Sequence, residues 1–315
     1  MPAPKVLFVT SNRIGDCVIS SGVIREIDRQ VPGARITVAC GRPPAPFFRS
    51  APGVERVIVL DKKKRAGHWF GLWRQVVGTR WDMVIDIRGS ALAYLIPART
   101  RRVYNRSWET GLAKVEMVSR MMGAGRTLDP ELFIDDRART DADVVIGGVT
   151  APIIALAPIA HQPGKSWPAD RWGELVGRLK AEPRFDGWRF MLVGGPGDHG
   201  PAAPALRAAG DRAIDFVGKG DILASAAAIA RADLFVGNDS GLMHVAAAAG
   251  RPTLGLFGPT EWWLYGPWGP RTRTAASNET RGQFAPIEAL NVDHVFEATL
   301  KLHDAFIAGR TPVAP

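Results

Sequence analysis

Short apolar runs and amphipathic stretches alternate along most of the chain. The runs contain few polar residues, which is typical of strands buried on both faces of a parallel sheet. Stretches with helical spacing, such as residues 17–29, separate them. The alternation predicts an α/β protein with parallel sheets. Strands are expected at residues 6–10, 35–39, 57–60, 83–87, 153–156, 190–193, 216–218, 234–236 and 253–257.

A chain of 315 residues is long enough for two such domains. Residues 127–150 are polar and end in Gly147-Gly148, which makes them the best candidate for a linker. We therefore expect an N-terminal domain at residues 1–148 and a C-terminal domain at residues 149–291. An amphipathic helix and a tail are expected to follow at residues 292–315.

The formal net charge of +9 resides in the N-terminal half. Residues 1–150 hold 24 Lys and Arg against 15 Asp and Glu, whereas the remaining residues hold equal numbers of each sign. This asymmetry indicates an anionic partner for that half, either a phosphorylated acceptor, a membrane surface or nucleic acid. No nucleic-acid-binding motif accompanies the charge, so nucleic acid is not expected.

Composition narrows the remaining classes of protein. No apolar run approaches the length of a membrane span and no N-terminal signal is visible, so we expect a cytoplasmic protein. The only two cysteines, Cys17 and Cys40, lack the spacing of a zinc site, and the six histidines include no His-x-x-x-His pair. Neither a metal nor another cofactor is therefore expected.

The most informative stretch is residues 235–260, which reads as strand, loop, helix and strand. Its loop presents Asp239, Ser240 and Gly241 where the helix begins, so free backbone N–H groups there could bind a phosphate. Alternatively, Asp239 or Ser240 is simply the N-cap of the helix. A carboxylate repels phosphate, so Asp239 would either cap the helix or bind a sugar hydroxyl. His244, one turn further on, could face the same ligand or be packed in the core.

The segments 238–244, 251–252 and 256–260 together resemble the nucleotide-sugar signature of the heptosyltransferase family, glycosyltransferase family 9. The resemblance implies a GT-B fold, in which two Rossmann-like α/β domains face a central cleft. The acceptor would bind the N-terminal domain and the sugar nucleotide the C-terminal domain. In the resembled fold the helix in residues 292–315 crosses back to the N-terminal domain.

Two further motifs are similar to family motifs that include chemically active residues. Residues 12–16 resemble the Gly-Asp signature, which implies that Asp16 is the catalytic base, although an acid at the start of a helix can also be only a cap. Residues 165–168 resemble the Lys-x-Trp-Pro element, which implies that Lys165 contacts the donor diphosphate. Without the resemblance, Lys165 would pass for an exposed loop lysine.

The acceptor side departs from the family pattern. Residues 86–90 resemble the Asp-x-Gln-Gly motif, but Arg88 stands where Gln is usual, and an arginine has a fixed charge and accepts no hydrogen bond. A second basic cluster follows, and we expect it to face phosphate or carboxylate groups of the acceptor. It consists of Arg99, Arg101, Arg102 and Arg106.

Two aromatic segments remain open to two readings. The basic run 62–65 precedes Trp69, Phe70 and Trp73, and together they could contact a membrane interface or an anionic glycolipid, or only form a solvated face. Residues 262–268 are rich in tryptophan and are expected to form a loop. Their rings could stack on a sugar or a nucleobase, or only fix the loop to the core.

Taken together, the resemblance implies an inverting, metal-independent glycosyltransferase. It would transfer a heptose, or a related sugar, from an ADP-sugar to a lipopolysaccharide core acceptor, an anionic glycolipid. Peripheral contact with the cytoplasmic face of the inner membrane is a further expectation. One alternative is a GT-B enzyme for another nucleotide sugar, either a transferase or an epimerase. The other is a protein without catalytic activity that binds anions or membranes.

Overall fold

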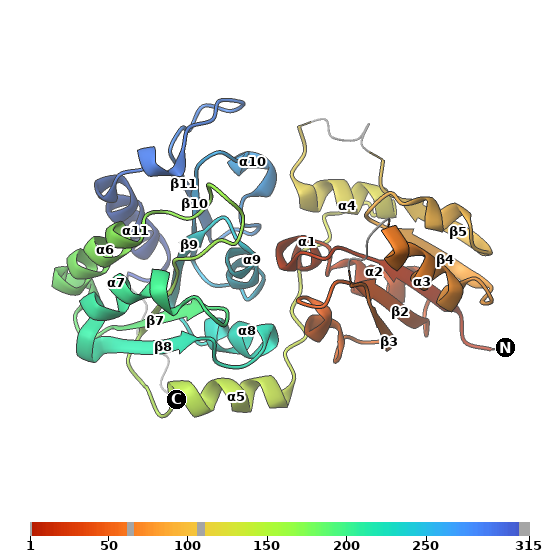
Figure 1. The fold of residues 1–315 in the computed structure, drawn as a ribbon, viewed down its shortest axis with the longest axis horizontal. Coiled ribbons are helices and arrows are strands. Elements are labelled where there is room, and N and C mark those ends of the chain that lie inside the picture. Colours follow the sequence, from red (N-terminus) through yellow and green to blue (C-terminus); the bar gives the residue numbers. More distant parts are fainter. Residues whose placement is uncertain (1, 62–65, 106–110, 309–315) are drawn as a thin grey trace. The chain divides into compact units, whose positions relative to one another are not determined.

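The computed structural model describes residues 2–61, 66–105 and 111–308 (Figure 1). The basic run 62–65 and Arg106 therefore lie outside the described residues. The chain divides into two compact units, the first ending at Phe133 and the second beginning at Ile134. Each unit is built on one sheet of parallel strands, which confirms the predicted α/β class.

The first unit contains a five-stranded sheet in the order β3-β2-β1-β4-β5. All four pairings are parallel, with Lys5 opposite Arg35 and Val6 opposite Met83. The strands are β1 (Lys5–Val9), β2 (Arg35–Cys40), β3 (Val54–Val59), β4 (Trp81–Asp86) and β5 (Ala98–Val103). The helices are α1 (Ile14–Ile19), α2 (Val23–Gln30), α3 (Gly67–Val76) and α4 (Lys114–Met122), with 3₁₀ turns η1 (Ala45–Phe48) and η3 (Ala91–Tyr94).

The second unit contains a six-stranded parallel sheet in the order β11-β10-β9-β6-β7-β8. Counted from the first strand of each unit, both orders follow the Rossmann arrangement. The strands are β6 (Ile153–Ala157), β7 (Arg189–Gly194), β8 (Ala213–Val217), β9 (Leu234–Asn238), β10 (Thr253–Phe257) and β11 (Thr272–Ala276). The helices are α5 (Asp136–Ile146), α6 (Ala169–Ala181), α7 (His199–Ala209), α8 (Ile222–Ala230), α9 (Gly241–Ala248), α10 (Trp262–Tyr265) and α11 (Val292–Phe306), with 3₁₀ turns η5 (Pro183–Phe185), η6 (Gly210–Arg212) and η7 (Ile287–Ala289).

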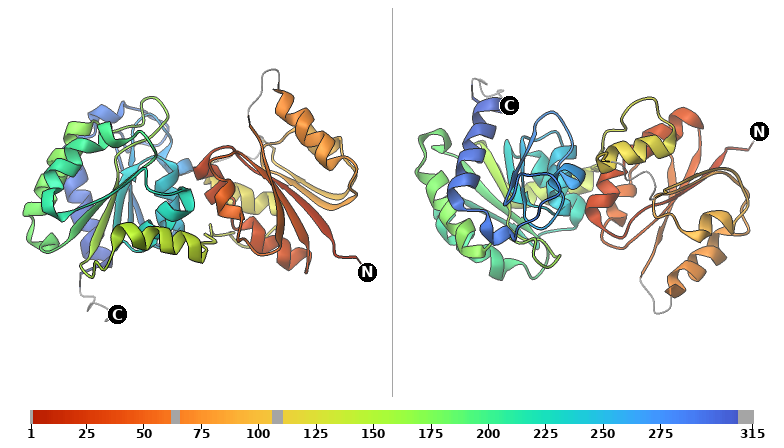
Figure 2. Two further views of the ribbon diagram at one scale, coloured as in Figure 1. Left: turned by 60° about the horizontal axis from the view of Figure 1, so that its bottom comes forward. Right: turned by 90° about the horizontal axis from the view of Figure 1, so that it is seen from above.

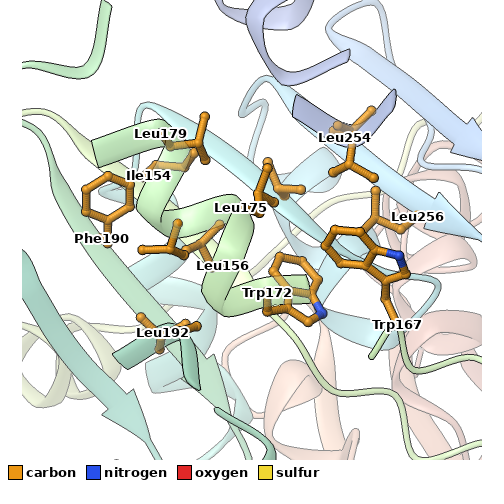
Figure 3. Close-up of a cluster of buried hydrophobic side chains, with 14 of the residues drawn as sticks. Ile154, Leu156, Trp167, Trp172, Leu175, Leu179, Phe190, Leu192, Leu254 and Leu256 are labelled. Carbon is orange, nitrogen blue, oxygen red and sulfur yellow. The ribbon is translucent and has the colours of Figure 1, made fainter. Parts of the chain in front are cut away.

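Helices cover both faces of each sheet, as Figure 2 shows. In the second unit α6 packs against α7 and α11, while α8 packs against α5 and α9. Between the first group of helices and the sheet lies an apolar cluster in which Trp167 meets Trp172 edge to face at 5.4 Å (Figure 3). The central strands are buried on both faces, which explains why their sequences lack alternating polar residues.

The helix predicted at residues 17–29 is interrupted. It forms α1 and α2 with a break between them, because the hydroxyls of Ser20 and Ser21 donate to carbonyl oxygens of α1. Such bonds compete with the helical backbone pattern. Gly22 follows, and a Cβ there would collide with the carbonyl oxygen of Asp129.

The domain boundary lies earlier than the sequence predicted. Residues 127–150 were expected to be a linker ending the domain 1–148, but 136–146 form helix α5, which belongs to the second unit and packs against α8. Its N-cap Asp135 accepts the Ala138 N–H at 2.8 Å, and Ala142 and Ile146 are buried. The sequence of α5 resembles that of a linker because the exposed face of the helix is rich in charged residues.

The final helix, α11, packs against α6, β10 and β11 of the second unit. The crossing of the segment 292–315 back to the first domain stays a prediction. Val295 and Leu302 are fully buried in the cluster that contains Trp167. The predicted apolar stripe is thus buried in the core of the second unit.

Two strands were absent from the predicted list. Each is an edge strand, β5 of the first sheet and β11 of the second, and their sequences contain Arg and Thr because one edge of the strand has no neighbour in the sheet. The expected loop 262–268 includes the short helix α10. No helix in the described residues is long and apolar enough to cross a membrane.

A buried ion cluster in the first unit gives a test of its stability. The fully buried Glu26 carboxylate accepts from Arg29 at 2.6 and 2.9 Å and from Gln30 at 2.7 Å. The bonds from Arg29 lower the pKa of Glu26. We expect Glu26→Gln to reduce the free energy of unfolding by about 1–3 kcal/mol at neutral pH, because the amide loses charge-assisted bonds.

The pH dependence has a definite sign. Because the folded-state pKa is lowered, the ionised Glu26 stabilises the fold above its unfolded pKa, and this contribution is lost as the pH falls through the folded-state value. Urea unfolding near neutral pH and in acid should therefore show a difference between wild type and variant that shrinks in acid. Glu131→Gln, which removes an exposed pair with Arg25, is the control. Equal effects of the two substitutions would contradict the prediction.

Candidate active site

The strand orders determine where a ligand can bind in each unit. In a Rossmann sheet the first strands are added on one side of the first strand and the later strands on its other side. The loops at the carboxyl ends of the strands diverge at this point. This point lies between β1 and β4 in the first unit and between β6 and β9 in the second. Asp16 follows β1, Arg88 follows β4, Lys165 follows β6 and Asp239 follows β9.

Lys165 and Asp239 meet directly in the second unit. The Lys165 Nζ donates to Asp239 Oδ2 at 2.6 Å, and both side chains are largely buried. The Thr260 hydroxyl, which follows β10, donates to the same oxygen at 2.7 Å. Lys165 is therefore an oriented, mostly buried cation and not an exposed loop lysine. Thr260 ends the motif segment 256–260, but no role had been assigned to its side chain from the sequence.

Buried hydrogen bonds fix the loop that contains Lys165. The side chain of Asn238, at the end of β9, donates to the Pro158 carbonyl at 2.7 Å and accepts the Trp167 N–H at 3.2 Å. The Ser166 hydroxyl accepts from the Ala160 N–H and donates to its carbonyl. The loop from 158 to 167 is consequently joined both to itself and to β9.

The start of α9 has no side-chain cap. Ser240 is the N-cap residue, but neither it nor Asp239 accepts a hydrogen bond from the first turn. The Ser240 Oγ is buried and has no hydrogen-bond partner within the described part of the chain. The alternative that these residues merely cap the helix is therefore not what the structure contains. Gly241 begins the helix, and His244 is buried within it.

A second acid lies at the neighbouring strand. Asp198, after β7, is buried and accepts the Gly195 N–H at 2.7 Å. Its other oxygen lies 3.5 Å from the His161 Nε2, which belongs to the loop of Lys165. Asp198 ends the glycine-rich turn 194–198, for which no role had been predicted.

In the first unit Asp16 lies in the first turn of α1 and lines a pocket of about 240 Å³. The Ser11 hydroxyl donates to Asp16 Oδ2 at 2.9 Å. No side-chain cap bonds the start of α1, so Asp16 does not act as its cap. Arg88 and Lys114 line the same pocket, so one carboxylate and two cations face a common space.

The turn after β4 orients Arg88. The Asp86 carboxylate is fully buried and accepts the N–H groups of Arg88 and Ser90 at 2.8 and 2.9 Å. Burial raises the pKa of Asp86, and these hydrogen bonds oppose that shift. The Arg88 guanidinium donates to Asn12 Oδ1 at 3.2 Å and lies over the Trp69 ring at 4.8 Å.

Lys114 is a site residue that sequence reasoning missed. Its Nζ contacts the Tyr104 hydroxyl at 3.1 Å and lies 4.9 Å from the centre of that ring. The Tyr104 N–H donates to the Asp86 carbonyl, so β4 positions this tyrosine. No local motif surrounds Lys114, and only the fold brings it beside Asp16.

The second basic cluster is only partly assembled. Arg101 and Arg102 line a pocket of about 1030 Å³ together with Arg88 and Lys114, whereas Arg99 is exposed on β5 and does not line it. The Arg101 guanidinium donates to three carbonyls around η3, at distances of 2.7, 2.9 and 3.1 Å. Arg101 thus stabilises a turn, and Arg88 and Arg102 are better placed to bind an anion.

Comparison with known proteins identifies the family. The family model described as glycosyltransferase family 9 (heptosyltransferase) matches residues 116–285, which is more than half of the chain. The chain belongs to glycosyltransferase family 9. It is therefore a glycosyltransferase, as the motifs around Asp16, Lys165 and Asp239 predicted.

Individual relatives extend over nearly the whole chain. Lipopolysaccharide heptosyltransferase 1 of Salmonella typhimurium is 25% identical over 309 residues, covering 87% of this chain and 95% of its own. The family 9 glycosyltransferase of Veillonella parvula has a TM-score of 0.79 at 21% identity, covering 95% of this chain and 97% of its own. The E. coli heptosyltransferase WaaC, solved with ADP, has a TM-score of 0.72 at 18% identity and covers 95% and 99%. The GT-B fold class is thereby confirmed.

Two expectations about this glycosyltransferase remain predictions. One is that it needs no metal ion, and the other is that the aromatic rings of residues 262–268 stack on a sugar or a nucleobase. No group of three or more His, Cys, Asp or Glu in the described residues could hold a metal ion, but metal independence is a property of the reaction. In the segment 262–268, Trp262 and Trp263 have buried indole nitrogens without a partner in the described chain. The Arg281 guanidinium lies 3.9 Å from the centre of the Trp263 ring.

The bonds of Asn238 give a test of how the Lys165 loop is held. Asn238→Ala would leave the Pro158 carbonyl and the Trp167 N–H unpaired, at a cost of about 1–3 kcal/mol. We expect amide hydrogen exchange in residues 158–167 to become about tenfold faster or more. Asn278→Ala, at a partly exposed asparagine of the same unit, should leave these amides unchanged. Unchanged exchange in both variants would show that the loop does not depend on Asn238.

Proposed function

We propose that this enzyme transfers a heptose from an ADP-sugar to a lipopolysaccharide core acceptor, with inversion and without a metal ion. The observation that supports this most strongly is the uncapped start of α9 beside the Lys165–Asp239 pair. Free N–H groups, a buried hydroxyl and an oriented ammonium form a site for a diphosphate. The E. coli heptosyltransferase solved with ADP supports the choice of nucleotide.

The donor would bind to the second unit through its diphosphate. Lys165 would exchange its bond with Asp239 for one with a phosphate oxygen, and the N–H groups at the start of α9 would bind further oxygens. Asp239 would then be free to accept a sugar hydroxyl. These groups stabilise the negative charge that develops on the leaving ADP, which is work that a metal ion performs in other transferases.

The acceptor would bind to the first unit with its attacking hydroxyl at Asp16. The Asp16 carboxylate removes the hydroxyl proton while the oxygen attacks the anomeric carbon. The bond between that carbon and the β-phosphate oxygen breaks, and ADP leaves with the bonding electrons. Arg88 and Lys114, which share the Asp16 pocket, would bind an anionic group of the acceptor. We expect the enzyme to work at the cytoplasmic face of the inner membrane, where a lipid-linked acceptor would lie.

Binding of ADP in metal-free buffer tests the donor site. Lys165→Ala should weaken ADP binding about tenfold to a hundredfold, because it removes a charge-assisted bond to phosphate. Lys180→Ala removes a lysine of the same unit that is paired with Asp211 on the surface, and should leave the affinity unchanged. Calorimetric titration with ADP, UDP and GDP measures both effects and the preferred base. Preference for another base would exclude the ADP-sugar, and failure to bind any nucleotide would contradict the proposed donor site.

Turnover tests the role of Asp16. Asp16→Asn preserves the size of the side chain but removes the base, so release of ADP should fall at least about a hundredfold while ADP affinity is kept. Asp129→Asn, at an acid that does not line the Asp16 pocket, serves as the control. Unchanged turnover in Asp16→Asn would exclude it as the base. Consumption of the donor at the same rate without an acceptor would contradict transfer to a lipopolysaccharide core.

A further inference from the structure

A large apolar groove lies in the first unit beside the Asp16 pocket. It has a volume of about 770 Å³ and is open to solvent. Apart from Arg88 and Ser90, its walls are formed by apolar side chains of α3 and the turn η3 with its flanks. These are Trp69, Phe70, Trp73, Ala91, Leu92 and Leu95.

Two of the apolar residues in the groove walls are strongly exposed. Phe70 and Leu95 remain 62% and 64% accessible, whereas most large apolar residues in the described chain are buried. Leaving such a surface in water is unfavourable, and contiguous exposed apolar patches commonly mark binding sites. The groove is therefore a candidate site for an apolar ligand.

Hydrogen bonds hold the two walls in place. The Trp73 indole nitrogen donates to the Leu95 carbonyl at 3.2 Å, which joins α3 to the end of η3. Phe70 stacks on Trp73 with ring centres 5.7 Å apart. Arg101 bonds the carbonyls of Ala93 and Ile96 from the neighbouring strand. The groove is thus formed before any ligand binds, which reduces the entropic cost of binding.

One residue connects the groove to the proposed acceptor site. Arg88 lines the groove, the Asp16 pocket and the basic pocket that also includes Arg102 and Lys114. Its guanidinium lies over the Trp69 ring, so one end of the groove is cationic and the rest is apolar. This division of charge matches a molecule with an anionic head and a hydrocarbon chain.

We propose that the groove binds a hydrocarbon chain of the glycolipid acceptor while Arg88 binds an anionic group of its head. The inference rests on the proposed function, because it assigns the chain and the sugar of one acceptor to adjoining sites. A volume of about 770 Å³ is within the range of pockets that enclose small organic ligands. Acyl-chain recognition would then contribute to the choice of acceptor.

Alkyl phosphates with chains of four, eight and twelve carbons test the groove without any glycosyl transfer. Kept below micelle-forming concentrations, they should bind wild type with an affinity that rises about twofold or more for each added methylene. Phe70→Ala and Leu95→Asp should flatten this dependence on chain length. Butyl phosphate, with the shortest chain, measures mainly the binding of the phosphate head. A changed charge near Arg88 alters the binding of that head equally in all three compounds, so the slope of affinity against chain length does not depend on it.

A matched control separates the groove from general surface effects. Val144→Asp introduces the same charge at an 80% exposed apolar residue of α5 in the second unit, and should preserve the wild-type slope. Affinity that is independent of chain length in wild type would overturn the proposal. A second result would also overturn it. If Leu95→Asp abolishes binding to vesicles while the affinity for single alkyl phosphates does not depend on chain length, the groove is a membrane-contact surface and not a site for one chain.

Activity measurements distinguish failure of the groove from failure of the proposed function. With acylated and deacylated forms of one acceptor, Leu95→Asp should raise the KM ratio of acylated to deacylated substrate at least tenfold. An unchanged ratio in an active enzyme would overturn the groove and leave the transferase function intact. An enzyme that transfers no heptose to either acceptor, but still binds alkyl phosphates by chain length, would overturn the proposed function alone.

Discussion

Two parallel strand pairings determine the chemistry of this protein. Pairing of β1 with β4 sets Val9 opposite Asp86, and pairing of β6 with β9 sets Ala157 opposite Gly237. Because parallel strands end at the same edge, the loops that follow them must meet. Asp16 and Arg88 thereby come to one pocket, and Lys165 reaches Asp239. A slip in either register would separate these groups while leaving every local motif intact.

Much of the fold could be predicted from apolar runs, since central strands such as β1 and β10 are buried on both faces. The strands β5 and β11 could not, because an edge position admits Arg and Thr, and a polar exposed face hid α5. The missed edge strands and the missed helix α5 share a cause, because packing against a neighbouring element overrides local sequence preference.

The site was predictable only where residues lie within a motif. Asp16, Lys165 and Asp239 each follow a strand in a recognisable segment, so the family resemblance located them. Thr260 also lies in a motif segment, 256–260, but its bond to Asp239 was not expected. Lys114 has no such signal, and tertiary packing alone brings it to the Asp16 pocket. The charge excess of the N-terminal half was equally unspecific. Arg101 is engaged with backbone carbonyls, so charge by itself does not reveal which arginines face a ligand.

The pairing of Lys165 with Asp239 resolves an apparent contradiction at the proposed donor site. A carboxylate beside a phosphate-binding helix would repel the ligand if it were unpaired, but here it accepts bonds from Lys165 and Thr260. The buried pair is close to neutral, so neither charge is left uncompensated before the donor arrives. In the proposed mechanism Lys165 would turn to a phosphate, Thr260 would still donate to the carboxylate, and a sugar hydroxyl would replace the lysine. A neutral residue in place of Asp239 would leave Lys165 without orientation, which gives an acid a role at the proposed anion site.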